Sequence, residues 1–377
     1  MARLLIAAVI LGACGPQQAA LTPTPTAPVS ATASPPRPLD FVAIQRVDSR
    51  TGFVAGWRGT GLGLGRTTDG GASWTKLAVP ANELTELRFI NAATGWAIGS
   101  GDRYVLLRTD DGGATWRETL SVPFPGGGPV LHDLQAVDGM NAWVVVGDAT
   151  CAAFCGTEIR ATSDGGKTWR TLYQGQVGPI RFVTPRRGWI AAYGAKGVAY
   201  GADGGNLLVT SDGGATWTNV LPAQPIVAID AIDELVVWAL ARDGAYCSAS
   251  SCAKYELFRS TDAGATWTSA GNPKLQLADS CTGGRFAGPH FASLSRGWFG
   301  LNEGAGGVSG IGSIIATDDG GTTWRCARAQ AEVALLSAAD ADHVWAVDSG
   351  RGTRPMQLLA SDDGGQSWRA LDLTALR

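Results

Sequence analysis

From residue 40 to the C-terminus, apolar and polar residues alternate in short runs that glycines separate. One unit shows the pattern clearly, in residues 86–90, 96–98, 105–109 and 115–118. Alternation with period two over short runs is typical of β-strands, and glycines between such runs favour tight turns. The pattern therefore predicts four strands in this unit. No stretch of the sequence reaches the roughly 18 apolar residues that a membrane-spanning helix needs.

An eight-residue motif, Thr/Ser-x-Asp-Gly/Ala-Gly-x-Thr/Ser-Trp, occurs seven times and divides this region into seven units. Its final tryptophans are about 49 residues apart on average between Trp74 and Trp368. A second aromatic residue precedes each motif: Phe53, Trp96, Trp143, Trp189, Trp238, Trp298 and Trp345. A four-stranded unit that recurs every 40 to 50 residues or so is the signature of a β-propeller blade. We therefore predict an all-β fold, a seven-bladed β-propeller of four-stranded antiparallel blades, over residues 40–377.

The residue types of the motif favour a structural function. Adjacent glycines, as in Asp69-Gly70-Gly71, permit the positive φ of a tight turn, and the aspartate can accept N–H groups of that turn. The tryptophan is expected to cover the hairpin and pack into the blade interior. A calcium loop at Asp110-Asp111-Gly112 is the alternative, but the other ligands of such a loop do not follow. The residues given this structural function are Asp69, Trp74, Asp111, Trp116, Asp164, Trp169, Asp212, Trp217, Asp262, Trp267, Asp319, Trp324, Asp363 and Trp368.

In these motifs the sequence resembles the Asp-box (BNR) repeat family, over about 330 residues. Residues 95–99 (Gly-Trp-Ala-Ile-Gly) and 106–116 (Leu-Leu-Arg-Thr-Asp-Asp-Gly-Gly-Ala-Thr-Trp) look most like the photosystem II assembly and stability factors of that family. The resemblance implies motifs that lie between the third and fourth strands of each blade and stabilise the fold. It also implies a scaffold that binds a protein partner. Other members are sialidases, xyloglucan-active glycosidases and sortilin-type receptors.

The N-terminus has the features of an export signal. Arg3 is followed by a run of apolar residues and then by Leu11-Gly12-Ala13-Cys14, which resembles the lipobox of bacterial lipoproteins. We predict a signal peptide at 1–13, lipidation at Cys14 and a proline-rich linker at 14–39, which place the chain outside the cytoplasm and anchored to a membrane. An ordinary signal peptide with an incidental cysteine is the alternative.

Long insertions follow the upstream aromatic residue in four units. The stretch from this residue to the motif has 13 residues in the second unit but 19 to 22 residues in the next four. If the motif joins strands three and four, these insertions lie on the opposite face, as binding loops on a rigid scaffold do. They are residues 148–156, 194–205, 243–255 and 302–313.

Six cysteines remain after Cys14, an even number that suits disulfides in an exported protein. Cys151 with Cys155, and Cys247 with Cys252, are close enough in sequence to close local loops, which leaves Cys281 with Cys326. Zinc binding is the alternative, although no histidine is close to these cysteines in sequence. The three histidines, His132, His290 and His343, are too dispersed to propose a metal site, so we predict no metal and no cofactor.

A polar position precedes each upstream aromatic by eight residues, and the residue before it is always apolar. With period two, one of these columns packs between blades and the other lines the central channel. We expect Arg88 and Arg181 to bind a small anion or the carboxylate end of a peptide, with Gln135 between them. A solvated channel wall is the alternative. The seven ring positions are Gln45, Arg88, Gln135, Arg181, Asp230, His290 and Ser337.

Charge and chemistry leave two classes of function. The chain carries 30 basic and 33 acidic residues, which argues against nucleic acid as a partner. The first class is a membrane-tethered scaffold that binds a protein partner, such as a membrane protein complex. The second is a glycoside hydrolase or carbohydrate-binding protein, which would use two loop carboxylates. The candidates are Asp102, Asp148, Asp203, Asp243, Glu303 and Asp348, and we assign no catalytic residue.

Overall fold

A computed structural model describes residues 41–56, 63–123, 129–148, 155–193, 205–221, 225–243, 254–273, 285–302, 312–329, 331–350 and 355–376. The chain divides into two compact units, Met1–Pro36 and Arg37–Arg377. The first lies outside the described residues, together with the predicted signal peptide, Cys14 and the linker at 14–39, so these remain predictions.

The predicted all-β fold is confirmed. The described strands form six antiparallel sheets, five with four strands and one with seven. The four-stranded sheets are β1 (Phe41–Arg46), β2 (Gly52–Gly56), β3 (Leu64–Thr67) and β4 (Thr75–Leu77); β5 (Glu83–Phe89), β6 (Gly95–Ser100), β7 (Arg103–Thr109) and β8 (Arg117–Pro123); β16 (Ile226–Ala231), β17 (Val237–Asp243), β18 (Lys254–Ser260) and β19 (Thr268–Gly271); β20 (Arg285–Phe291), β21 (Gly297–Asn302), β22 (Ser313–Thr317) and β23 (Arg325–Ala329); and β24 (Val333–Ala338), β25 (Val344–Asp348), β26 (Gln357–Ser361) and β27 (Arg369–Ala370).

The seven-stranded sheet joins the third and fourth sequence units through one long strand. Its strands are β9 (Pro129–Ala136), β10 (Ala142–Asp148), β11 (Cys155–Thr162), β12 (Arg170–Phe182), β13 (Gly188–Ala192), β14 (Asn206–Thr210) and β15 (Thr218–Leu221). The first part of β12 pairs with β11, from Arg170 to Val177, and its last part pairs with β13, from Val177 to Phe182. This strand therefore has the fourth-strand position of one unit and the first-strand position of the next.

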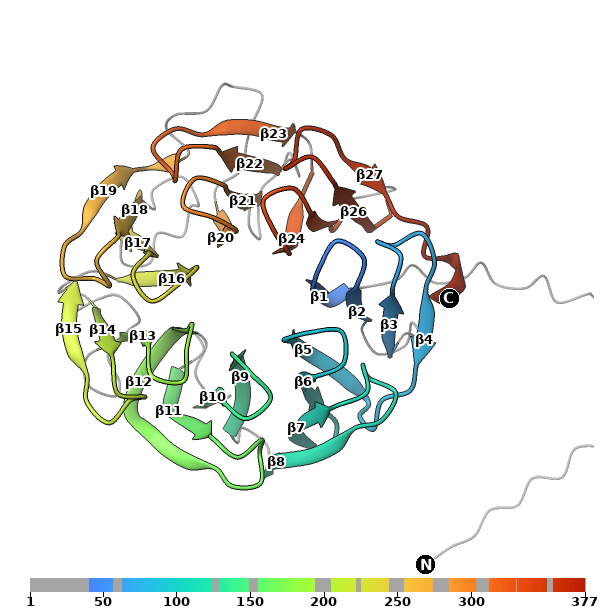
Figure 1. Cartoon of the computed structure of the whole chain (residues 1–377), viewed down its shortest axis with the longest axis horizontal. Coiled ribbons are helices and arrows are strands. Elements are labelled where there is room, and N and C mark those ends of the chain that lie inside the picture. Colours follow the sequence, from blue (N-terminus) through green and yellow to red (C-terminus); the bar gives the residue numbers. More distant parts are fainter. Residues whose placement is uncertain are drawn as a thin grey trace, which may run out of the picture. The chain divides into compact units, whose positions relative to one another are not determined.

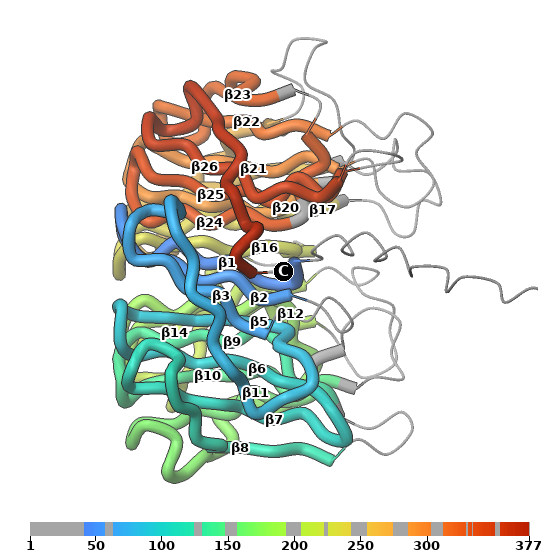
Figure 2. Tube along the Cα trace, turned by 90° about the vertical axis from the view of Figure 1, so that its right-hand side faces the viewer, coloured from blue at the N-terminus to red at the C-terminus, as the bar shows by residue number. Residues whose placement is uncertain are grey.

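The sheets stand around a central space (Figure 1), with β1, β5, β9, β12, β16, β20 and β24 nearest to it. The first and last sheets each contain four strands of consecutive sequence, so no strand is shared where the ring closes. A short 3-10 turn, η2 (Thr374–Leu376), contacts β4 instead, and the C-terminal segment runs alongside the first sheet (Figures 1 and 2). Side-chain packing, hydrogen bonds and the ion pair of Arg46 with Asp362 therefore close the ring.

Seven hydrophobic clusters form the core, and each lies between consecutive sequence units. Every cluster contains the upstream aromatic of one unit and the motif tryptophan of the next. Trp96 packs with Trp169, for example, and Trp345 of the last unit packs with Trp74 of the first. The centroids of Trp74 and Trp345 are 5.5 Å apart. The motif tryptophan lies on its own hairpin, where Trp116 Nε1 donates to Gly113 O at 3.1 Å, and it also packs against the preceding unit, a contact that the sequence did not predict.

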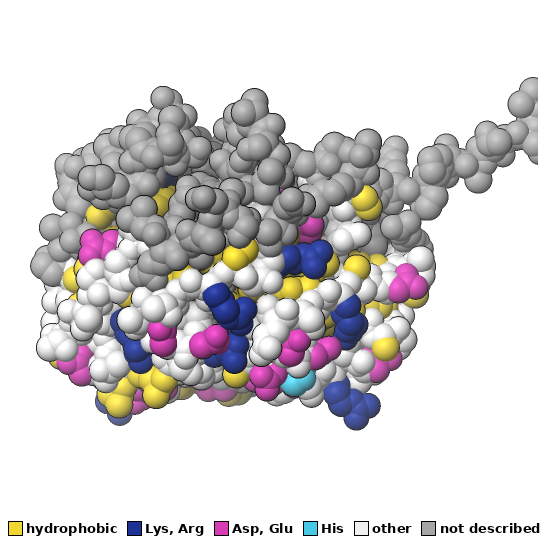
Figure 3. Space-filling view, turned by 90° about the horizontal axis from the view of Figure 1, so that it is seen from above, with side chains coloured by type: hydrophobic (Ala, Val, Ile, Leu, Met, Phe, Trp, Pro, Cys, Tyr) yellow, Lys and Arg dark blue, Asp and Glu magenta, His cyan; other side chains and the backbone are white. Residues whose placement is uncertain are grey.

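The outer surface carries charges of both signs. On the side in Figure 3, Lys and Arg side chains are interspersed with Asp and Glu. In the described part of the chain, no helix is long and apolar enough to cross a membrane.

Candidate functional site

Each Asp-box motif forms the same hydrogen-bonded corner between the third and fourth strands of its unit. In the second unit, Thr109 Oγ1 donates to Asp111 Oδ1 at 2.8 Å and accepts the Gly113 N–H at 2.9 Å. Asp111 also accepts the N–H and the hydroxyl of Thr115, at 2.8 and 2.6 Å. These hydrogen bonds, above all those of Thr115, lower the pKa of Asp111 to about 2. Since the carboxylate oxygens are occupied by this corner, the geometry suits a structural function.

The motifs share one face with the turns that connect the first and second strands of the units. Gly112 N donates to Ala93 O at 2.7 Å, and Gly165 N donates to Met140 O at 2.9 Å. The corresponding bond recurs in all seven units, from the motif to the turn of its own unit. We call this side the Asp-box face.

A cavity of about 400 Å³ lies in the centre of the ring, at the Asp-box face. Its walls are the last residues of the innermost strands and the first residues of the turns that follow. Ile90 and Val137, for example, are the first turn residues after β5 and β9. The lining residues are Gln45, Arg46, Val47, Arg88, Phe89, Ile90, Ala136, Val137, Arg181, Phe182, Val183, Ala231, Ile232, His290, Phe291, Ala292, Ala338 and Ala339.

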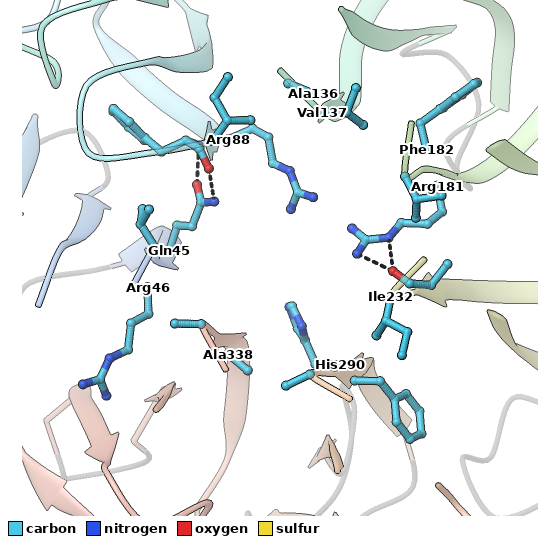
Figure 4. Close-up of a pocket in the computed structure, with 18 residues that line it drawn as sticks. Gln45, Arg46, Arg88, Ala136, Val137, Arg181, Phe182, Ile232, His290 and Ala338 are labelled. Carbon is cyan, nitrogen blue, oxygen red and sulfur yellow. Dashed lines mark hydrogen bonds between the residues drawn. The ribbon is translucent and has the colours of Figure 1, made fainter. Parts of the chain in front are cut away.

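Two of the ring residues predicted from the sequence hold the backbone of the next unit. Gln45 donates from Nε2 to Phe89 O at 2.7 Å and accepts the Phe89 N–H at 2.5 Å. Ser337 accepts the N–H of Arg46 at 3.0 Å, where the last unit meets the first. Figure 4 shows Gln45 turned along the wall of the cavity, and Arg46 directed away from the centre. These polar side chains therefore join units.

Arg181 and Asp230 also act between units. Arg181 Nη2 donates to Ala231 O at 2.8 Å and lies 3.1 Å from Asp230 Oδ1. Asp230 Oδ2 accepts the N–H of Phe291 at 2.6 Å. Asp230 is 4% exposed, so this pair is largely removed from water. We expected Arg181 to be available to a ligand. In the structure, the next unit instead supplies Ala231 O and the Asp230 carboxylate as partners of its guanidinium.

Arg88, Gln135 and His290 are the ring residues with unused hydrogen-bonding groups. Among the described residues, neither Arg88 nor His290 has a hydrogen bond or ion pair, and Gln135 Oε1 is buried without a donor. Arg88 and His290 point into the central space (Figure 4). Burial and the nearby Arg181 lower the pKa of Arg88 to about 10, against the opposing effect of Asp230. Arg88 is therefore still a cation at neutral pH.

Burial lowers the pKa of His290, and Arg181 and Arg88 act in the same direction, while Asp230 opposes them. The imidazole of His290 is therefore predominantly neutral at pH 7. A neutral imidazole can donate one hydrogen bond and accept another. Arg88 and His290, which both line the cavity, therefore offer a cationic fork and an imidazole to a ligand, a pair that suits a carboxylate.

Two buried acidic residues on the innermost strands β5 and β9 were missed from the sequence. Glu86 accepts the N–H of Asp133 at 2.9 Å and that of Leu134 at 2.8 Å, across the boundary between the second and third units. Burial and the neighbouring Glu86 raise the pKa of Asp133 to about 8. Glu86 and Asp133 each precede a ring residue by two positions, so the period of two that located the ring was also the signal for this pair.

The six carboxylates that the sequence offered for glycoside hydrolysis have varied positions. Asp102 is exposed in the turn between β6 and β7, while Asp348 is 4% exposed and accepts the backbone N–H groups of Glu332 and Gly350. Asp203 and Glu303 lie outside the described residues, as do the side chains of Asp148 and Asp243. The structure thus brings none of the six into a described pair.

Cys326 lies in β23 and is disulfide-bonded. Its predicted partner Cys281, the pairs Cys151–Cys155 and Cys247–Cys252 and the four long insertions fall wholly or largely outside the described residues, so these pairings and the binding face assigned to the insertions remain predictions. Where the structure is described, no group of three or more His, Cys, Asp or Glu residues could hold a metal ion.

Antiparallel sheets around a central cavity, with an Asp-box corner in every unit, define the fold as a β-propeller. Residues 35–197 match the family described as "Photosynthesis system II assembly factor YCF48". The match contains the first three motifs, ends before the fourth, and covers less than half of the chain. No curated protein matches the sequence significantly.

Solved structures support the same fold. One titled "YCF48 bound to D1 peptide" has a TM-score of 0.55 at 17% identity, over 86% of this chain and 94% of that one. YCF48 from Cyanidioschyzon merolae has a TM-score of 0.54 at 20% identity, over 88% and 95%. The tricorn protease has a TM-score of 0.58 at 11% identity, over 90% of this chain and 35% of that one. At such identities the likeness extends to the fold alone.

Proposed function

We propose that this protein is a membrane-tethered, extracytoplasmic scaffold that binds a protein partner through the central cavity. The observation that carries the proposal is Arg88, a cation without a hydrogen bond or ion pair among the described residues, which points into a cavity of about 400 Å³. An unpaired guanidinium in a confined space is costly, and a carboxylate would relieve that cost through two parallel hydrogen bonds. The carboxylate at the end of a peptide fits this description.

The match to the YCF48 family and the solved complex of YCF48 with a D1 peptide favour a protein partner, in the manner of photosystem II assembly factors. A membrane protein complex is the partner that this likeness suggests. The identity of this partner is part of the proposal, because fold alone does not determine function.

We further propose that the unit is a seven-bladed propeller, in which β12 belongs to two blades. Seven motifs with the same corner, seven turns on the Asp-box face and seven interunit clusters support this arrangement. The change of partner along β12, from β11 to β13, falls near Val177. The two blades would remain continuous because no turn interrupts that strand.

The tether rests on the sequence. Lipidation of Cys14 would place several acyl chains at the start of the mature chain, and residues 15–39 with seven prolines would separate the propeller from the membrane surface. Replacement of Cys14 by serine should abolish incorporation of radioactive palmitate. Undiminished labelling of Cys14→Ser would contradict the lipid anchor while leaving the binding site untouched.

Glycoside hydrolysis is the weaker candidate. Asp102 and Asp348 are the candidates whose side chains the structure describes, and Asp348 already accepts two backbone N–H groups. No described pair of these carboxylates supports the reaction, so we do not assign it.

Photo-crosslinking tests the proposed function. A benzophenone side chain at Val137, which lines the cavity, should capture a partner protein in the host, and mass spectrometry should find the crosslink in the partner's C-terminal peptide. A probe at the exposed Thr171 on β12 is the matched control. Arg88→Gln should lower capture about tenfold, since a hydrogen bond to a charged group contributes about 1.5–3 kcal/mol. Capture that Arg88→Gln leaves unchanged would overturn the proposal.

A further inference from the structure

Exposed large apolar side chains gather at the end of the ring where the cavity lies. Among the described residues they are Met140, Leu235 and Leu294, with 48%, 56% and 52% exposure. All three belong to turns between a first and a second strand, those of β9–β10, β16–β17 and β20–β21. A single exposed leucine needs no explanation. Three on corresponding turns around one opening form a patterned surface, which we call the turn rim.

The turn rim is close to the cavity. Val137, Ile232 and Ala292 line the cavity and begin these same turns. Met140 and Leu235 follow three residues later, and Leu294 two residues later. Because consecutive Cα atoms are about 3.8 Å apart, each rim Cα lies within about 11 Å of a lining Cα. An extended peptide covers that distance in about three residues.

Charge on the same turns indicates what the rim can accept. Asp138 accepts the N–H groups of Met140 and Asn141, and Asp233 accepts those of Leu235 and Val236. These two carboxylates put negative charge beside Met140 and Leu235, which disfavours an anionic lipid surface there, while the turn of Leu294 has Ser293 at the equivalent position. Inside the cavity lies Arg88, a cation without a hydrogen bond or ion pair among the described residues. The complementary ligand therefore has a negative end and apolar side chains just behind it.

We infer that the turn rim binds apolar side chains of a partner's extended C-terminal segment, about three residues before the carboxylate that enters the cavity. The inference rests on the proposed function and adds the sequence requirement at that site. It also assigns the Asp-box face as the docking side, whereas the sequence favoured the face with the long insertions. The segment would contact the third, fifth and sixth units and pass the fourth, since the corresponding turns of the first, second, fourth and seventh units carry Arg50, Ala93, Arg186 and Asp342.

Two pools of fluorescent hexapeptides with free C-termini test the inference on the full chain. One pool has leucine at the third and fourth positions from the end, the other has serine there, and both are random in polar residues elsewhere. The leucine pool should bind the native chain about tenfold more tightly, as expected when apolar side chains leave water. In the variant Met140→Ser/Leu235→Ser/Leu294→Ser this preference should fall to about twofold or less. Ala93→Ser, at the corresponding turn position of the second unit, is the matched control and should retain the preference.

The outcomes separate the two proposals. Equal binding of both pools to the native chain, or a preference that the triple variant retains, would overturn the turn rim. If Arg88→Gln still weakens both pools in that case, the proposed function stands without the rim. If Arg88→Gln has no effect on either pool, the proposed function fails and the rim inference fails with it. Intrinsic tryptophan fluorescence during urea unfolding verifies that each variant is folded.

Discussion

The Asp-box corners and the channel ring both repeat seven times, yet they differ in what repeats. At every corner the same side chains make the same bonds: Thr67 to Asp69 in the first unit corresponds to Thr317 to Asp319 in the sixth. At the ring, position and spacing repeat while the residue changes from Gln45 to Arg88 to Ser337. Uniform chemistry suits a task that is the same in each unit, the closure of a hairpin. Varied chemistry suits a single asymmetric cavity.

A second difference lies within the ring. Gln45, Arg181, Asp230 and Ser337 bond to the neighbouring unit, while Arg88, Gln135 and His290 keep unused groups. Loss of a bonded residue should therefore lower stability, and loss of an unbonded one should affect binding.

Trp74→Ala should lower the free energy of unfolding by about 3–5 kcal/mol. Trp74 is 8% exposed and packs on Trp345 where the last unit meets the first, so its loss opens a void at ring closure. Urea denaturation followed by circular dichroism measures the change. Met140→Ala, at a side chain 48% exposed, is the control and should stay within about 0.5 kcal/mol. A Trp74→Ala effect as small as the control would contradict closure by packing.

Asp230→Ala should cost about 3 kcal/mol of stability. The change leaves Arg181 without its carboxylate and Phe291 N–H without its acceptor, in a site where Asp230 is 4% exposed. Arg88→Met, which removes a cation with no hydrogen bond or ion pair in the described structure, should stay within about 1 kcal/mol of the native chain. The same denaturation experiment compares them. Equal losses of unfolding free energy in both variants would contradict the proposed difference between bonded and unbonded ring residues.

Stability should fall as pH rises from about 7 to 8, and Asp133→Asn should flatten that decline. Burial and Glu86 raise the pKa of Asp133 to about 8 in the folded chain, so the folded state holds a proton that the unfolded state has released. Stability therefore decreases with pH across this window. Burial lowers the pKa of His132 to about 4 and also lowers that of His290, which gives the opposite slope at lower pH.

Above about pH 7 these histidines are mostly neutral in both states, so the decline comes from the buried acidic pair of Asp133 and Glu86, whose pKa burial also raises. Urea midpoints at the two pH values measure the slope. A native chain whose midpoint rises over this interval, or an Asp133→Asn variant with an unchanged decline, would argue against the buried acidic pair.

Ala263→Gly should raise stability by about 1 kcal/mol. Six motifs have glycine at this position, but the fifth has Ala263 at φ 64°, in the left-handed region that costs a residue with a Cβ atom about 1–2 kcal/mol. Thermal unfolding of the variant measures the gain. Ala265→Gly, two residues further along the same corner and exposed, should give no gain. If both substitutions act alike, the strain at Ala263 is not the cause.

The sequence predicted the corners more fully than the site. Motif residues lie within eight positions of one another, so their types and spacing specify the bonds among Thr109, Asp111 and Thr115. The ring position followed from period two and alignment on the aromatic residues. The partners of the ring residues did not, because Gln45 meets Phe89 and Asp230 meets Phe291, 44 and 61 residues away. Such contacts depend on how one unit stacks on the next.

The motif tryptophan illustrates the same limit. Its residue type predicts burial, but only the stacking of units shows that Trp169 packs with Trp96 of the preceding unit. The turn rim also had a signal in the sequence, since Met140 and Leu235 each follow a ring residue by five positions. Exposure of those side chains, however, is a property of the folded turns.

The most direct test of the central claim is the preference of the native chain and of Arg88→Gln for a free C-terminal carboxylate. The leucine pool of fluorescent hexapeptides is titrated by fluorescence anisotropy in two forms, with a free and with an amidated C-terminus. If the unbonded cation of the ring receives the carboxylate, the native chain should bind the free form about tenfold more tightly, and Arg88→Gln should bind both forms alike. A preference that persists in folded Arg88→Gln, or a native chain that does not distinguish the two forms, would contradict the claim.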